Sequence, residues 1–465
     1  MTVSDPTSLP VHRLSREVSS GKLSPVDLVD AYLEKIRRLD GEFHAYTEVY
    51  FEDARLAAEA AHKAIRSGHA LGPLHGIPVA LKDLVELKGR VVTGGSKIWQ
   101  TRRSEQTAPL ARQLIAQGLV ILGKTHLVEF AFGGWGTNQK MGTPRNPWDL
   151  KVPRTPGGSS SGSGVAVAAG LAPWAVGTDT GGSVRLPASF CGLTGLKVSV
   201  GRISTEGLLP LSTTLDTPGP MAGCVEDVAL LYNAMRTDRC VQLDHQSFKS
   251  DELHLARGVR GMRLGTMPAA ERRNVVPAVL DAYDASLEVF ARLGAEIVPL
   301  ALPFGLVDLA ELNGLIISTE GYRFLERYVE DRGLPLDDHV RPRVLGGRGV
   351  SAKSYLAALE KRELLKQQFV SVFQGVDALL TPTTATPAIP LSEVDEKTTP
   401  AYFTRFVNLL DLTALALPNG FSPEGLPASL QIVCRANAEA TALQVGQAYQ
   451  QATDWHDRRP QSPLS

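Results

Sequence analysis

The sequence has few cysteines, no long apolar run and almost no net charge. Its four cysteines, Cys191, Cys224, Cys240 and Cys434, show no CxxC spacing in a chain of 465 residues. We therefore expect reduced, mostly buried thiols and no disulfide framework. The 48 Lys and Arg residues balance 49 Asp and Glu, for a formal charge of −1. Such a balance excludes the electrostatic footprint of a dedicated nucleic-acid or acidic-membrane binder, so neither partner is expected.

The sequence also lacks the features of a leader, a membrane span or a metal site. The first 30 residues carry several charges and no apolar core segment, so no secretory signal is predicted. The longest charge-free stretch, residues 155–178, contains six glycines, two prolines and four serines, which excludes a membrane helix. The ten histidines include no HExxH or comparable spacing, and no metal is expected. We expect a cytoplasmic protein.

Helical and strand patterns alternate along the chain. Helices are predicted from Pro25 onward and over 51–67, 107–117, 280–290 and 440–452. Strands are predicted over 77–81, 119–122, 296–300, 377–381 and 429–434. This alternation indicates an α/β fold with a mixed, largely buried sheet. We interpret 1–465 as one domain: a helical region at about 1–70, a catalytic core at about 71–235, and a remainder from about 236 that completes the sheet and the pocket. The polar connection 236–260 does not demand a second domain.

Two motif matches are misleading. Residues 118–125 fit the phosphate-binding pattern GxxxxGK[ST], but their variable positions are Leu, Val, Ile and Leu, which form the predicted strand itself. Lys124 is therefore interpreted as an ordinary lysine at a strand end. Residues 158–162 fit GxSxG, but two prolines precede them where a nucleophile elbow needs an apolar strand. A Ser-His-Asp hydrolase that uses Ser160 stays a minor alternative.

Glycine is concentrated in one part of the chain. Eighteen of the 43 glycines lie between Gly133 and Gly223, more than twice the share that even spreading would give. Dense glycine indicates positive-φ turns or backbone that approaches a ligand. If 161–171 is a helix and 173–178 a returning strand, Ser159 and Ser183 come side by side. We expect the chemistry there.

Two further features suit acyl-transfer chemistry. The run Thr180-Gly181-Gly182-Ser183 offers consecutive backbone N–H groups for an oxyanion, with a serine at its end. Lys82 follows an apolar run that would bury it, and burial lowers the pKa of a lysine enough for it to act as a general base. Taken singly, each feature has an ordinary structural explanation: a Gly-Gly-Ser turn or a lysine in an ion pair.

In combination these residues resemble a known family, the amidase signature enzymes. The likeness lies in the blocks 76–83, 156–163 and 179–187, and continues through 191–192, 195–197, 201–202, 216–220 and 425–431. It spans roughly residues 20–458, and its central block is highly specific. It implies a single large α/β domain whose mixed sheet is covered by helices on both faces.

The resemblance also implies a site. Ser183 would be the nucleophile, Ser159 a relay serine after a cis peptide bond, and Lys82 the base. The oxyanion hole would be the N–H groups of Thr180, Gly181, Gly182 and Ser183, with Ser160, Asp179 and Arg185 in support. Ser161 stands where many members have glycine, a mild departure.

The same family likeness places substrate-binding residues at Phe132, Gly133, Gly134 and Trp135, although packing of these aromatics in the core is an equal alternative. The expected activity is hydrolysis of a small-molecule amide through a seryl acyl-enzyme, without a cofactor. An alternative is the glutaminase subunit of a tRNA-dependent amidotransferase, which looks similar over the same blocks. A non-catalytic scaffold is a third. A homodimer is a family-level expectation.

Overall fold

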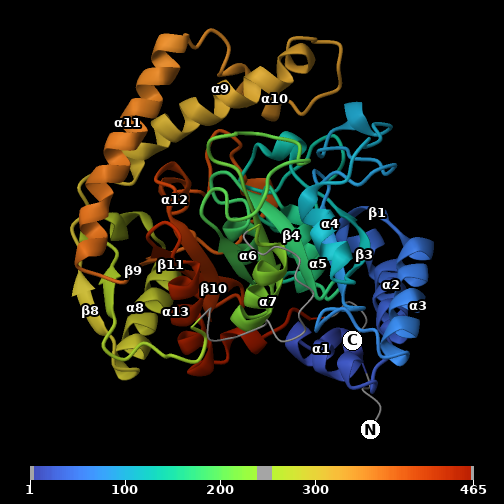
Figure 1. Ribbon diagram of the computed structural model, residues 1–465. Coiled ribbons are helices and arrows are strands. Elements are labelled where there is room, and N and C mark those ends of the chain that lie inside the picture. The colour runs from blue at the N-terminus through green and yellow to red at the C-terminus, as the bar shows by residue number, and fades with distance from the viewer. Residues whose placement is uncertain (1–4, 238–253, 462–465) are drawn as a thin grey trace.

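The computed structural model describes residues 5–237 and 254–461. One sheet of eleven strands crosses the molecule in the order β1-β3-β2-β4-β6-β5-β10-β11-β9-β7-β8 (Figure 1). The strands are β1 (Tyr46–Val49), β2 (Pro78–Lys82), β3 (Val120–Thr125), β4 (Trp174–Asp179), β5 (Thr194–Lys197), β6 (Thr217–Ala222), β7 (Arg263–Thr266), β8 (Glu296–Pro299), β9 (Ala378–Pro382), β10 (Thr413–Phe421) and β11 (Pro427–Cys434).

The sheet is mixed, which confirms the predicted fold class. Strand β2 runs parallel to both β3 and β4, and β7 runs parallel to β8 and β9. The remaining neighbours are antiparallel, with β10 and β11 as the longest ladder. The carboxyl ends of β2 and β4 therefore meet at one edge, where parallel strands commonly place polar groups.

Helices begin and end largely where the sequence predicts. In α2, the hydroxyl of Ser24 caps the first turn by accepting from the N–H of Val26, and Pro25 is the first helical residue. The helices are α1 (Val11–Ser19), α2 (Pro25–Phe43), α3 (Phe51–Arg66), α4 (Pro109–Ala116), α5 (Ser161–Ala168), α6 (Arg185–Phe190), α7 (Val225–Met235), α8 (Pro277–Arg292), α9 (Ala310–Val329), α10 (Val340–Leu345), α11 (Ala352–Val370), α12 (Arg405–Leu409) and α13 (Glu439–Gln451).

Helices cover both faces of the sheet, as expected. Gln431 on β11 bonds to Arg185 of α6, and its ladder partner is Ala416 on β10. The next residue on β10, Leu415, faces the opposite way and packs on Gly446 of α13. The helices α9, α10 and α11 form a separate layer at the top of the view, over the loops that follow the central strands (Figure 1).

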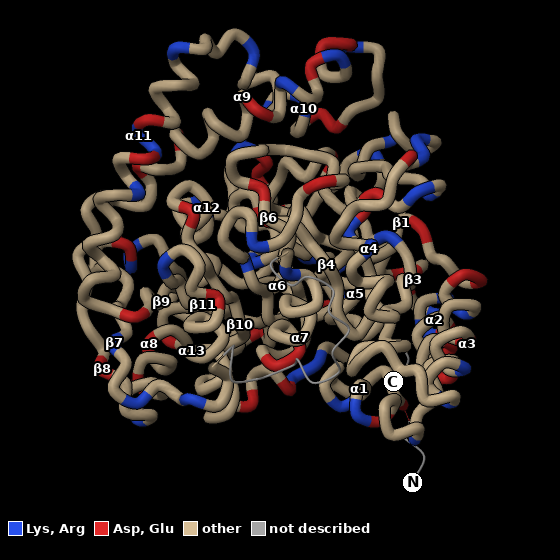
Figure 2. Tube along the Cα trace, viewed as in Figure 1, with Lys and Arg blue, Asp and Glu red and all other residues tan. Residues whose placement is uncertain are grey.

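The surface and the termini bear on the remaining composition arguments. Positive and negative side chains are interspersed along the trace, without a large region of one sign (Figure 2). Within residues 5–237 and 254–461, no helix has both the length and the hydropathy that a membrane span needs. Of the cysteines, Cys191, Cys224 and Cys434 are free thiols. Cys240 and most of the connection 236–260 lie outside the described residues.

The phosphate-binding pattern at 118–125 is a strand, as predicted, but Lys124 is not an ordinary lysine at a strand end. Its side chain lies wholly inside the protein on β3. Its Nζ donates to the carbonyl of Val85 at 2.6 Å and pairs with Asp83 at 3.5 Å. Burial lowers the pKa of Lys124 and raises that of Asp83, and their mutual attraction opposes both shifts. The lysine therefore locks β3 to the segment after β2.

Substitution of Lys124 tests this lock. Lys124→Met leaves the carboxyl of Asp83 buried without its cation, so the free energy of unfolding should fall by about 3 kcal/mol. Arg37→Met is the matched control, because Arg37 forms an exposed ion pair with Glu34 and its removal should cost less than about 1 kcal/mol. Urea denaturation measures both. Equal, small losses in the two variants would contradict the structural role of Lys124.

Candidate active site

Three segments bring the predicted catalytic side chains together at one edge of the sheet. Lys82 is the last residue of β2, Ser159 lies just before α5, and Ser183 follows β4. The helix α5 ends at Ala168, three residues earlier than predicted, and β4 returns over Trp174–Asp179. Since β2 and β4 are adjacent and parallel, their carboxyl ends deliver Lys82 and the loop of Ser183 to the same place.

Lys82 is completely buried and held by two hydroxyls. Its Nζ lies 2.8 Å from Ser159 Oγ and 2.8 Å from Thr178 Oγ1. Burial lowers the pKa of Lys82 from 10.5 to about 7, while the carboxylates of Asp216 and Asp179 act in the opposite direction. A lysine of this kind exchanges a proton near neutral pH, as a general base must.

The backbone around Ser159 is tightly enclosed. The peptide bond between Gly158 and Ser159 is cis, as the family resemblance implies. A Cβ on Gly158 would lie 2.8 Å from the Cα of Gly136, so only glycine fits there. The carbonyl of Ser159 accepts from the N–H of Val128 at 3.1 Å, and the N–H of Ser160 donates to the carbonyl of Ser183 at 3.4 Å.

Ser160 points away from the nucleophile position. Its Oγ accepts from the N–H of Thr178 at 3.2 Å and lies 3.3 Å from the carbonyl of the same residue. Its hydroxyl is fully buried and bonded to β4, and no histidine is among its partners. The geometry therefore supports Ser160 as a clamp between the Ser159 turn and β4, and gives no support to Ser160 as the nucleophile of a Ser-His-Asp site.

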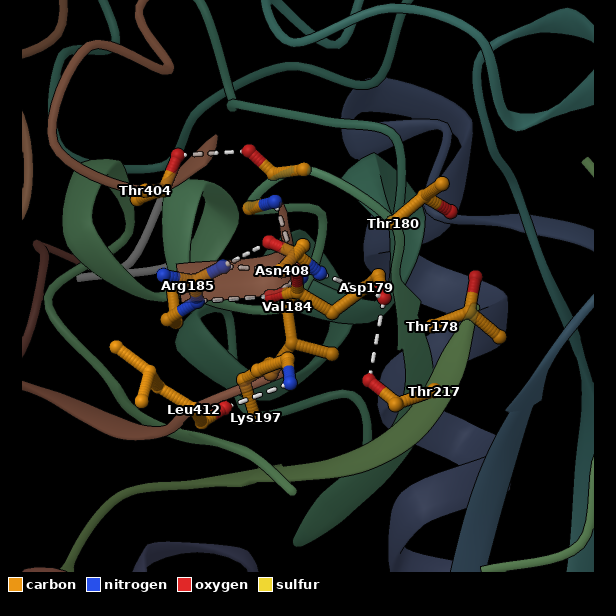
Figure 3. A network of polar contacts seen from close by, with 12 residues as sticks. Thr178, Asp179, Thr180, Val184, Arg185, Lys197, Thr217, Thr404, Asn408 and Leu412 are labelled. Atoms are coloured by element: carbon orange, nitrogen blue, oxygen red, sulfur yellow. Dashed lines mark hydrogen bonds and ion pairs between the residues drawn. The ribbon is translucent and has the colours of Figure 1, made fainter. Parts of the chain in front are cut away.

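Asp179 anchors the loop that carries Ser183 (Figure 3). Its two carboxylate oxygens accept from the N–H groups of Gly182 and Val184 at 2.7 and 3.2 Å. They also accept from Arg185 at 3.0 and 2.9 Å and from Asn408 at 2.9 Å. All of these side chains are buried, and the charge of Arg185, despite burial, holds the pKa of Asp179 at about 2. The carboxylate is thus a permanent acceptor at the centre of the loop.

Arg185 and Asn408 carry this anchor into the rest of the sheet. Arg185 also donates to the side-chain oxygens of Asn408 and Gln431 at 2.7 and 2.6 Å. Lys197, buried on β5, donates to the carbonyl of Leu412 at 2.7 Å beneath the same network. The loop is therefore held from α12, β11 and β5 together.

Gly182 has a different role from the one expected. Its N–H is committed to Asp179, so it is not free to serve as an oxyanion donor. Its φ is +129°, and a Cβ would lie 2.3 Å from the hydroxyl oxygen of Thr404, which itself donates to the carbonyl of Gly181 at 2.7 Å. Glycine is required here by conformation and by space.

The remaining donors of the loop face a cavity. Among the described residues, neither the N–H of Gly181 nor that of Ser183 has a hydrogen-bond partner, and the hydroxyl of Ser183 has none either. Thr180, Gly181 and Ser183 all line a cavity of about 370 Å³. Thr180 is fixed from behind, because its hydroxyl donates to Asp216 at 2.5 Å. This arrangement suits an attacking hydroxyl beside unused donors.

The predicted substrate-binding residues divide into two groups. Phe132, Gly133 and Gly134 line the same cavity as Ser183. Trp135 is absent from that lining; it is buried and stacks on Phe190, with ring centroids 6.3 Å apart. The core alternative therefore describes Trp135, whereas Phe132 is placed to contact a ligand.

Sequence reasoning missed the residues that close the cavity and complete the network. They come from distant segments, and no local pattern marks them: Thr178, Ile317, Arg343, Glu396, Thr404, Arg405 and Asn408. Arg343 donates to the carbonyl of Phe132 at 2.9 Å and to the Glu396 carboxylate at 2.6 Å. The layer of α9 and α10 thus forms one wall of the cavity.

Substitution of Gly182 tests the loop geometry. Gly182→Ala forces a Cβ against Thr404, so the reactivity of Ser183 towards a fluorophosphonate should fall by about 100-fold or more, an effect of the size found when an oxyanion donor is lost. Gly201→Ala is the matched control: its φ is +82° and nothing lies within 4 Å of an added Cβ. It should label at the wild-type rate. Unchanged labelling of Gly182→Ala would show that this loop does not set the reactivity.

Comparison with known proteins agrees with this geometry. The family model named Amidase matches residues 27–443. A subunit of the glutamyl-tRNA(Gln) amidotransferase from Chloroflexus aggregans is 36% identical over 95% of this chain and 96% of its own. A crystal structure of an amidase superposes with a TM-score of 0.85 at 31% identity, covering 96% of this chain and 99% of that chain. The peptide amidase of Stenotrophomonas maltophilia superposes with a TM-score of 0.82 at 29% identity, covering 98% of each.

Proposed function

The chain belongs to the amidase signature family, and we propose that it hydrolyses the C–N bond of a small-molecule amide through an ester intermediate on Ser183. The observation that carries this proposal is the 2.8 Å hydrogen bond between the buried Lys82 and Ser159, next to a loop that presents Ser183 to a cavity. Nucleophile, relay and base are thus available without a histidine.

In the proposed acylation, the Oγ of Ser183 attacks the amide carbonyl and gives its proton to Ser159, which passes its own proton to neutral Lys82. Negative charge develops on the carbonyl oxygen, and the N–H groups of Gly181 and Ser183, with Thr180 beside them, are the proposed donors to it. Each such donor is typically worth about 100- to 1,000-fold in rate, or about 3–4 kcal/mol.

Collapse of the tetrahedral intermediate then breaks the C–N bond. The proton returns from Lys82 through Ser159 to the departing nitrogen, which leaves as a neutral amine or ammonia. A water molecule attacks the ester, with the same residues accepting its proton, and releases a carboxylic acid and the free Ser183. No step of this sequence uses a cofactor.

A second candidate is the glutaminase subunit of a tRNA-dependent amidotransferase. The similarity to one component of such an enzyme, 36% identity along nearly the whole of both chains, favours it. Ammonia release from a panel of amides, measured with the purified chain alone, separates the two. Strict dependence on glutamine and co-purification with partner proteins would favour the second candidate; turnover of other small amides by the isolated chain would favour the first.

Removal of the proposed nucleophile should abolish turnover. Ser183→Ala is expected to lose more than about 99.9% of the hydrolysis rate while keeping its thermal midpoint, because the hydroxyl makes no hydrogen bond within the described residues and its loss costs little stability. The control, Ser371→Ala, alters an exposed serine that caps the end of a helix and should retain full activity. A Ser183→Ala variant with a few per cent of wild-type turnover would refute the assignment.

The state of Lys82 predicts a pH profile. Since only neutral Lys82 accepts a proton, kcat/KM should rise with pH and level off above about 7, the pKa of Lys82. Below that pH the rate should fall about tenfold per unit. Because the carboxylate of Asp216 raises the pKa of Lys82, Asp216→Asn should move the rising limb to lower pH.

Asp395→Asn, at an exposed position, is the control and should leave the profile in place. Rates that are flat from about pH 5 to 8 in the wild type, or a limb that moves to higher pH in Asp216→Asn, would contradict Lys82 as the base.

A further inference from the structure

One cationic side chain in the cavity of Ser183 has no protein partner. Arg405, at the start of α12, is half-buried and lines the cavity, yet it has no hydrogen bond, ion pair or aromatic contact within residues 5–237 and 254–461. Elsewhere in the cavity charges are compensated: Arg343 pairs with Glu396, whose other oxygen accepts from Thr137. Lys397 is exposed at the rim.

The position of Arg405 is close to the reacting centre. A Cβ placed on Gly181 would lie 3.5 Å from its Cγ, so the stem of Arg405 packs on the loop that presents Ser183. Burial and the charge of Arg343 lower the pKa of Arg405, and no carboxylate of the described residues relieves this. A guanidinium nevertheless stays charged, and a buried charge without a partner is costly.

A second polar group beside Gly181 is also without a partner. The side chain of Asn313 on α9 is completely buried, and neither its amide oxygen nor its amide nitrogen has a hydrogen bond within the part of the chain that the structure describes. Its Oδ1 lies 3.8 Å from a Cβ placed on Gly181. Buried amides are rarely left unsatisfied, and such a group next to an unpaired guanidinium indicates a missing ligand.

We propose that the substrate is an amide whose acyl part ends in a carboxylate, and that Arg405 binds this carboxylate. The proposal rests on amide hydrolysis at Ser183. A planar guanidinium matches a carboxylate in a bidentate geometry, and the amide nitrogen of Asn313 is a further donor nearby. The anion lies on the acyl side because Arg405 occupies the cavity next to Gly181, whereas the leaving nitrogen must face Ser159 and Lys82.

This arrangement makes Arg405 a specificity-determining residue. The compact distance between Arg405 and Gly181 favours short acyl chains, such as the monoamides of small dicarboxylic acids. Discrimination against neutral amides follows from the same geometry, since a neutral group leaves the guanidinium dehydrated and unpaired.

The test compares two matched series of primary amides on the full chain. One series runs from malonamate to adipamate, and the other replaces each carboxylate by a methyl ketone of the same shape. At the best chain length, kcat/KM for the anionic member should exceed that for its neutral partner by about 30-fold or more, the range of a desolvated charge pair.

Arg405→Met should remove this preference by lowering kcat/KM for the anionic amide, while the neutral amide changes by less than about threefold. Arg405→Lys should keep part of it. Lys397→Met is the matched control, a cation at the rim whose removal should leave the ratio within about threefold. Since Arg405 makes no hydrogen bond in the described residues, Arg405→Met should fold normally, and equal fluorophosphonate labelling of Ser183 verifies this.

Three results would overturn the proposal: equal or faster turnover of the neutral amides at every chain length, an equal loss for both series in Arg405→Met, or an anionic series that neither turns over nor slows the labelling of Ser183. The proposed function itself fails in a different way. In that case Ser183 does not label and no amide in either series is hydrolysed.

Discussion

The buried carboxylate of Asp179 is the constraint on which the site depends. It accepts hydrogen bonds from two backbone amides of the 180–184 loop and from Arg185 and Asn408. Because Arg185 keeps the pKa of Asp179 at about 2, the carboxylate remains an acceptor over the whole physiological range. Without that charge, nothing would hold the glycine pair in its conformation against β4, and Ser183 would have no fixed place beside its proposed donors.

Burial acts on the two key charges of this region in opposite functional senses. Asp179 remains ionised because a guanidinium and an amide compensate it fully. Lys82 has only hydroxyl partners, so burial lowers its pKa to about 7. The same low-polarity interior therefore yields a permanent structural anion and a lysine ready to exchange a proton, separated by the short strand β4.

The sequence predicted the fold class and the central residues of the site well, because both are encoded locally. Helix starts such as Ser24-Pro25, the alternating strands, and the blocks around Lys82, Ser159 and Asp179 are short and contiguous. The burial of Lys82 followed from the apolar run before it. The relation of Ser159 to Ser183 followed from one helix and one strand between them, even though that helix ends early.

Other features depend on contacts between distant segments and had no local signal. Asn408 reaches Asp179 across 229 positions of the chain, and Thr404 reaches Gly181 across 223. For the same reason Gly182 was interpreted as a donor to an oxyanion, whereas its amide serves Asp179. Lys124 looked like a surface lysine because its partner, the carbonyl of Val85, lies on another segment. Trp135, similarly, packs on Phe190 instead of lining the cavity.

The most direct test of the account is to identify the acylated residue during turnover. The enzyme is mixed with an amide that it hydrolyses, quenched in acid, digested and analysed by mass spectrometry. The account predicts that the acyl group is found on the peptide that contains Ser183, and that the adduct is absent from Ser183→Ala. Turnover without an adduct on Ser183, or an adduct on Ser159 or Ser160, would contradict it.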